Sequence, residues 1–227
     1  MDRPYLVISD TQIPFEAERA LSFCAYLRKH YGIPDENVLH VGDEVDNLHG
    51  GLYPKDPDGH HSPTGEITAA KEKIKEWAAT FPKMKIAISN HGMRWFKKAS
   101  AAEIPSQMMR DYRQVLGMPD SWVFKDRWLF ETKHPFMMIH GMGYGGQFAH
   151  RTAAIDLGVS VVHGHLVHAG ISHICTASRR TWGMCVGCLI DVEAYAFKYG
   201  KDSRFKPCIG AGIIADNGRI PMWIPLE

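Results

Sequence analysis

The sequence predicts an α/β protein, and three features of the chain support that expectation. Short apolar runs, typical of buried strands, recur along the chain. Segments with apolar residues at helical spacing separate several of these runs. Five of the runs end in Asp, Asn or His. Because ligands bind at the carboxyl ends of strands in open α/β sheets, we expect a site assembled at one sheet edge.

The expected elements follow one another in a regular order. Strands ending in polar residues are predicted at residues 5–9, 38–41, 84–89, 136–139 and 160–162. Helices are predicted at residues 16–31 and 64–81, and mostly helical structure over 92–128. Further strands are predicted at residues 180–190, 208–215 and 220–224, the last two joined by a turn at Asp216-Asn217-Gly218.

Length and composition favour one globular domain over residues 1–227, with a loop insertion near 47–65 and a helical insertion near 92–128. No run of 18 apolar residues and no signal-peptide pattern occurs, so we expect a cytoplasmic protein without membrane contact. The net charge of +1 removes the simplest argument for bulk nucleic-acid binding. The five cysteines are expected to be reduced thiols.

The polar clusters after the five strands carry the candidate chemistry. They are Asp10-Thr11-Gln12, Gly42-Asp43-Glu44-Val45-Asp46, Ser89-Asn90-His91, His140-Gly141 and Gly164-His165. Carboxylate, imidazole and amide oxygen are ligands that divalent Mn, Fe, Co, Ni and Zn accept. Two such ions bridged by one carboxylate would form a clamp for phosphoryl transfer.

In this order the clusters resemble the calcineurin-like metallophosphoesterases, with their D-x-H, G-D-x-x-D, G-N-H-[DE], H and G-H-x-H motifs. The resemblance covers residues 5 to 175, about three quarters of the chain. It implies a four-layer α/β/β/α sandwich with a two-metal site at the sheet edge. It also implies hydrolysis of phosphate esters by a metal-bound hydroxide.

The resemblance also implies a role for each matching residue. Asp43 would bridge two divalent ions, manganese being expected and Fe, Zn, Ni or Co being alternatives. Asn90, His140 and His165 would complete the shell of one ion. His91 would be the general acid, and Asp46 would orient it and keep it protonated.

Two departures from the family pattern affect the other ion, which Asp10 and Asp43 would hold. Gln12 stands where the family has a histidine, and the last histidine of G-H-x-H is missing. His168, one residue late, His163 or water could replace it, although His168 would need a bulge or turn to face the site. We expect one tight and one weak metal site.

The substrate class is narrowed by two further absences. Asn47 and Gly92 stand where protein phosphatases of this family have an arginine and an acid. The absence of that arginine and of that acid favours phosphodiesters, including nucleotides or nucleic acid, as substrates. Arg94 could, however, bind the phosphate in place of the missing arginine. The alternatives are a phosphomonoesterase and a binding protein on a decayed phosphoesterase fold. The oligomeric state is left open.

Overall fold

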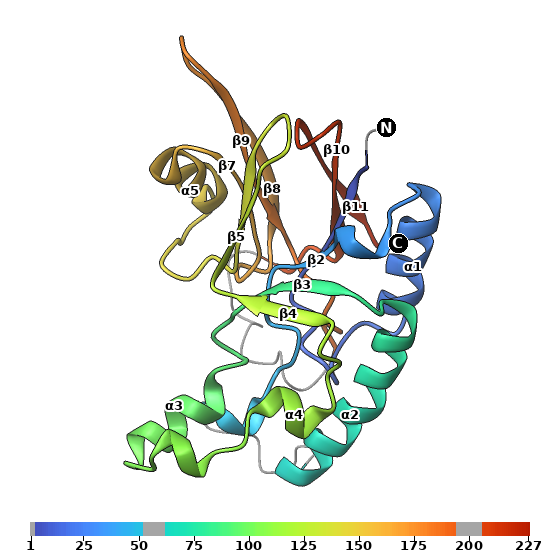
Figure 1. The fold of residues 1–227 in the computed structure, drawn as a ribbon, viewed down its shortest axis with the longest axis vertical. Helices are drawn as coiled ribbons and strands as arrows, with labels where there is room; N and C mark the ends of the chain where they lie inside the picture. The colour runs from blue at the N-terminus through green and yellow to red at the C-terminus, as the bar shows by residue number, and fades with distance from the viewer. Residues whose placement is uncertain (1–2, 52–61, 194–205) are drawn as a thin grey trace.

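Two β-sheets form the centre of the computed structural model, which describes residues 3–51, 62–193 and 206–227 (Figure 1). The first sheet has the strand order β11-β10-β1-β2-β3-β4, and the second has β5-β6-β7-β9-β8. The strands of the first sheet are β1 (Tyr5–Ile8), β2 (Val38–His40), β3 (Met84–Ala87), β4 (Trp122–Lys125), β10 (Gly210–Ala215) and β11 (Ile220–Pro225). Those of the second are β5 (Arg127–Phe130), β6 (Phe136–Ile139), β7 (Ser160–His163), β8 (Ala169–Cys175) and β9 (Arg180–Val186).

Five α-helices and three short 3-10 helices connect the described strands. The α-helices are α1 (Ala20–His30), α2 (Pro63–Thr80), α3 (Arg94–Ala101), α4 (Tyr112–Leu116) and α5 (Ala149–Leu157). The 3-10 helices are η1 (Asp35–Asn37), η2 (Leu48–Gly50) and η3 (Ser106–Met108). None of the described helices is both long and apolar enough to span a bilayer.

The strand pairing brings the polar clusters to one edge of each sheet. β1, β2, β3 and β4 pair in parallel, so their carboxyl ends point the same way. In the second sheet β6 and β7 are also parallel. The loops that follow β1, β2, β3, β6 and β7 therefore start from two adjacent sheet edges.

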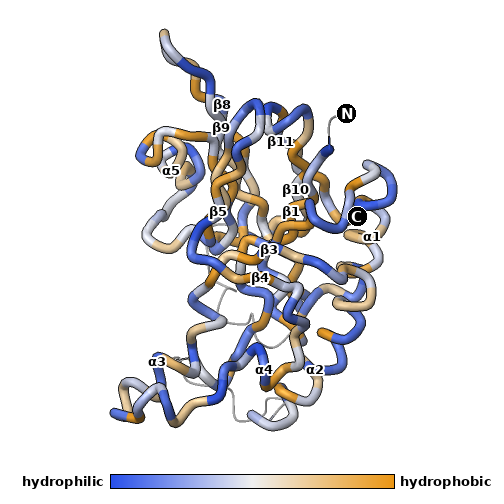
Figure 2. Tube along the Cα trace, viewed as in Figure 1, coloured by the Kyte–Doolittle hydropathy of each residue, from blue (hydrophilic) through white to orange (hydrophobic). Residues whose placement is uncertain are grey.

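The helices and the two sheets form four layers (Figure 1), and hydrophobic residues gather along the strands (Figure 2). α1 and α2 cover the outer face of the first sheet, where Cys24 and Trp77 pack against Leu6 and Ile86. The inner faces of the two sheets pack on each other through side chains that include Leu39, Val41, Phe136, Met138 and Met184. α5 covers the outer face of the second sheet through Ala153 and Ala154. The α/β/β/α sandwich predicted from the sequence is confirmed.

Indole groups join the two sheets by hydrogen bonds as well. Trp128 Nε1 of β5 donates to the carbonyl of Ile86 in β3, over 3.0 Å. Trp223 Nε1 of β11 donates to the carbonyl of Val186 in β9, over 2.8 Å. These bonds satisfy the polar end of each large ring inside an otherwise apolar interface.

The helical prediction for residues 92–128 is correct only in its first part. Helical structure ends at Leu116, and Trp122–Lys125 and Arg127–Phe130 are strands. In β4 the side chains alternate between more buried and exposed, which is the period of a strand rather than a helix. Of the loop predicted near 47–65, residues 52–61 lie outside the described part of the chain.

Candidate metal centre

The loops at the sheet edges are held in unusual backbone conformations. Asp10, Gln12, Asp43, Asn47 and His165 all have positive φ, between 39° and 66°. Such values are uncommon for residues other than glycine and cost about 1–3 kcal/mol each. Four of these residues belong to three of the predicted clusters, and Asn47 directly follows the second cluster. The concentration of such conformations marks these loops as strained, which is typical of functional sites.

Hydrogen bonds between the loops maintain this geometry. Gln12 N donates to the carbonyl of Asp43 over 2.9 Å, and Gly164 N donates to the carbonyl of His140 over 3.1 Å. His165 N donates to Oδ2 of Asp10 over 3.1 Å. A β-carbon at position 164 would overlap Oδ2 of Asp10, so only glycine fits beside this carboxylate.

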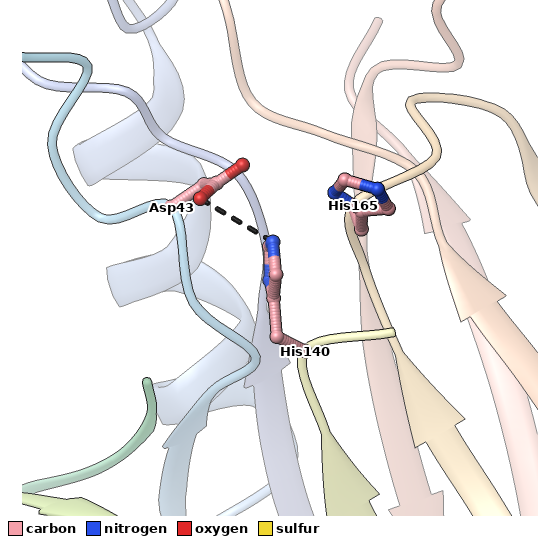
Figure 3. A group of neighbouring side chains, drawn as sticks. All are labelled: Asp43, His140 and His165. Atoms are coloured by element: carbon pink, nitrogen blue, oxygen red, sulfur yellow. Dashed lines mark ion pairs between the residues drawn. The ribbon is translucent and has the colours of Figure 1, made fainter. Parts of the chain in front are cut away.

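Asp43, His140 and His165 bring three donor atoms within 4.8 Å of one another (Figure 3). His140 Nε2 lies 3.3 Å from Oδ1 of Asp43 and 2.8 Å from Oδ1 of Asn90. His140 Nδ1 lies 2.9 Å from the carbonyl oxygen of Val41. A carbonyl can only accept, so Nδ1 carries a hydrogen and Nε2 faces the two oxygens.

The lone pairs of three atoms, Oδ1 of Asp43, Oδ1 of Asn90 and Nε2 of His140, are therefore directed at one another. Either a proton on Nε2 or a cation must separate His140 from Asp43. Burial by itself would lower the pKa of His140, but the charge and hydrogen bond of Asp43, the charge of Asp10 and the Val41 carbonyl together raise this pKa to about 9. Burial would likewise raise the pKa of Asp43, but His91 and His140 hold it well below its usual range. The donor set fits a divalent cation.

Asp10 and Gln12 add buried oxygens to the same region. Asp10 is fully buried, and its Oδ2 accepts hydrogen bonds from Ser9 Oγ and His165 N. Within the described residues, Oδ1 of Asp10, Oε1 of Gln12 and Nδ1 of His165 have no hydrogen-bond partner. Burial, followed by the charge of Asp43, raises the pKa of Asp10 to about 7. Buried acceptors without donors are destabilising, and a cation would satisfy them.

His91, Asp46 and Arg94 form a second group beside Asp43. His91 Nδ1 lies 2.9 Å from Oδ1 of Asp46, while its Nε2 lies 3.7 Å from Oδ2 of Asp43 and 2.7 Å from Nη2 of Arg94. Arg94 Nη1 donates both to Oδ1 of Asp46, over 2.9 Å, and to its carbonyl, over 2.8 Å. One carboxylate thus positions both an imidazole and a guanidinium. Asn47 Nδ2 supports the group by donating to the carbonyl of His91 over 3.0 Å.

His168, predicted as a ligand, is not a member of the close set of donors among the described residues. Among the described residues, the only set of three close donors is that of Asp43, His140 and His165. His168 lies near His150 of α5, whose pKa is lowered to about 4 by burial and then by His168. His163 is fully buried, with Nδ1 2.8 Å from the carbonyl oxygen of Gly164. Asp43, His140 and His165 form a candidate metal-binding group, and the ligand roles of these three and of Asp10, Gln12, Asn90 and His168 stay predictions.

Two buried pairs that support the site were missed by the sequence analysis. Thr11 Oγ1 donates to the carbonyl of Glu44 and lies 3.1 Å from Nε2 of His40. Tyr112 Oη donates to Oε1 of Glu44 over 2.7 Å. Tyr112 belongs to α4, so this bond ties the helical segment to the Asp43 loop. Nothing in the spacing of Glu44 and Tyr112 along the chain indicates that they meet.

Comparisons with known proteins give distant structural likenesses. No family model matches the sequence, and no curated protein matches it. A crystal structure of Vps29 from Chaetomium thermophilum matches 95% of this chain and 86% of its own, with 12% identity and a TM-score of 0.46. The protein TT1561 from Thermus thermophilus matches 96% of this chain and 100% of its own, with 9% identity and a TM-score of 0.39. The site described above rests on this chain's own residues.

The variant Asp43→Asn tests the donor group. Asparagine keeps the shape of the side chain but removes the charge that a divalent ion needs, so the affinity for Mn²⁺ should fall about tenfold or more. Isothermal titration of metal-stripped protein measures this affinity. Asp156→Asn, at an exposed position on α5, is the matched control and should bind as the parent does. An unchanged affinity in Asp43→Asn would contradict the assignment.

The burial of Glu44 makes stability depend on pH. Burial raises the pKa of Glu44 from 4.5 to about 7, so the folded state favours its protonated form. The resulting stabilisation is complete below pH 4.5 and is lost as the pH rises through 7. Glu44→Gln lacks this titration and still accepts from Tyr112.

Urea unfolding in chelator at about pH 5.5 and about pH 8 measures the difference between the two proteins. Relative to the parent, Glu44→Gln should gain about 1–2 kcal/mol in free energy of unfolding between the two pH values. A difference independent of pH would show that Glu44 does not titrate in this way.

Proposed function

We propose that the protein is a metal-dependent phosphoesterase that hydrolyses phosphodiester bonds, with nucleotides and nucleic acid as the first substrates to test. One observation carries the proposal. A cluster of metal-type donors, Asp43, His140 and His165, lies directly beside a His91–Asp46–Arg94 group suited to proton transfer and phosphate binding. Each group alone has structural explanations, but their contact through Asp43 and His91 favours a reaction centre.

Asp43, His140 and His165 would hold one divalent ion, and Asp10, Gln12 and Asn90 offer further oxygens. We propose two ions, manganese first, the one at Asp10 and Gln12 being the weaker. A divalent ion held there supplies an activated water and offsets negative charge on the phosphoryl oxygens. The acidic and neutral oxygen ligands suit manganese.

His91 and Arg94 would act on the ester itself. Oδ1 of Asp46 lies 2.9 Å from Nδ1 of His91, and Nε2 of the same ring lies 3.7 Å from Oδ2 of Asp43 and 2.7 Å from Nη2 of Arg94. Because a guanidinium can only donate, Nε2 accepts from Arg94 in this arrangement. Once a phosphoryl oxygen takes over that contact of Arg94, a protonated Nε2 can donate its proton to the leaving oxygen of the ester. The guanidinium of Arg94 can donate to phosphoryl oxygens through Nη2 while Asp46 keeps it oriented through Nη1.

Two other functions belong to the same fold. A phosphomonoesterase would use Arg94 to bind a phosphate dianion, which rewards a bidentate guanidinium. A binding protein without turnover is favoured by Gln12, an amide in place of an imidazole ligand. The relative rates of diester and monoester hydrolysis separate all three.

Initial rates on bis-p-nitrophenyl phosphate and p-nitrophenyl phosphate, with Mn²⁺ added to metal-stripped protein, test the proposal. We expect the diester to be hydrolysed faster than the monoester. Asp46→Asn should lower kcat by about 100-fold or more, because His91 and Arg94 lose their common partner, while Mn²⁺ affinity changes little. Asp156→Asn should keep full activity. A monoester preference would favour the phosphomonoesterase, and no turnover with several metals would favour the binding protein.

Gln12→His tests the proposed weaker ion. Histidine tolerates the positive φ of 46° at this position better than most residues, and its imidazole is a stronger ligand than an amide oxygen. We expect the weaker of two Mn²⁺ binding steps to tighten by about tenfold. Gln12→Glu, with a charged oxygen at the same place, is a second variant for comparison. Unchanged binding in both would show that residue 12 is not a ligand.

A further inference from the structure

A pocket of about 280 Å³ lies between α2, α3 and α4. Trp95 of α3 and Tyr112 of α4 supply aromatic walls, and Met109 and Leu116 close it with apolar surface. Arg110 and Asn47 are the polar residues that line it. Pockets for whole drug-sized ligands occupy about 300–1,000 Å³, so this one suits a single planar ring system.

Two residues of this pocket also support the candidate metal centre. Asn47 Nδ2 donates to the carbonyl of His91, and Tyr112 Oη donates to the carboxylate of Glu44, next to Asp43. Trp95 directly follows Arg94, which contacts both His91 and Asp46. The pocket therefore adjoins the side of the site at which a phosphate would bind.

The surroundings of the pocket carry positive charge. Arg110 is exposed at its border, and Lys97 and Lys98 are exposed on α3. Lys98 Nζ lies 5.7 Å from the centre of the Trp95 ring and donates to the carbonyl of His49 over 3.0 Å. An apolar aromatic pocket with cations at its border complements a ligand that joins a flat ring to a phosphate.

We propose that this pocket binds a nucleobase, stacked on Trp95, of a nucleotide-containing phosphodiester whose phosphate lies at Arg94. The proposal rests on the phosphodiesterase function proposed above, and it names the substrate class and the residue that recognises it. Every nucleobase can stack on an aromatic side chain, so the pocket would select for a nucleotide without selecting one nucleotide sequence.

Binding of adenosine to metal-free protein tests this pocket without involving the metal centre. Adenosine has no phosphate, so ligand-observed NMR titration in chelator measures the base interaction alone. The parent should bind, Trp95→Ala should raise Kd about fivefold or more, and Trp95→Tyr should restore most of the affinity. Tyr26→Ala, which removes an exposed ring on α1, is the matched control and should bind as the parent does. Circular dichroism confirms that each variant is folded.

The outcomes separate this inference from the proposed function. No adenosine binding by the parent, or equal Kd values for the parent and a folded Trp95→Ala, would overturn the nucleobase pocket even if bis-p-nitrophenyl phosphate is hydrolysed. Adenosine binding that depends on Trp95, without any hydrolysis of that diester, would instead contradict only the phosphodiesterase. Adenosine binding that depends on Trp95, together with hydrolysis of the diester, would support both the nucleobase pocket and a nucleotide as the substrate class.

Discussion

The convergence of lone pairs between Asp43 and His140 is the constraint on which the site depends. Two oxygens, from Asp43 and Asn90, lie within 3.3 Å of one imidazole nitrogen, and both acidic and imidazole side chains are buried. Such an arrangement is stable only when a positive charge, a proton or a metal ion, lies between the groups. The carbonyl of Val41, the residue after β2, lies 2.9 Å from Nδ1 of His140, the residue after β6. This contact orients a candidate ligand.

The loops at the sheet edges hold Asp43, Asn90 and His140 close together at an energetic cost. The loops at the site contain five non-glycine residues at positive φ. They also contain several buried polar atoms that have no hydrogen-bond partner among the described residues. Main-chain hydrogen bonds join these loops to one another. The two packed sheets, with their apolar interface and indole hydrogen bonds, provide the rigid frame that offsets this cost. Strain concentrated in one region of an otherwise regular fold is typical of sites kept for function rather than for stability.

Sequence patterns predicted the frame better than the details of the site. Parallel strands with polar ends are local signals, so the five clusters could be anticipated from the residues, whereas the four layers were implied only by the family resemblance. The strand β4 could not, because Trp122 and Phe124 lie in a short segment that a helical pattern also fits. The sharing of Asp46 between His91 and Arg94, and the bond from Tyr112 to Glu44, depend on side-chain directions that no spacing encodes.

Anomalous diffraction from crystals of the protein grown with Mn²⁺ tests the central claim most directly. The account predicts an anomalous peak bounded by Asp43, His140 and His165, with ligand distances of about 2.0–2.3 Å. A second, weaker peak on the side of Asp10 and Gln12 would agree with the proposed labile ion. Crystals that bind Mn²⁺ elsewhere, or leave His140 paired directly with Asp43 at millimolar Mn²⁺, would contradict it.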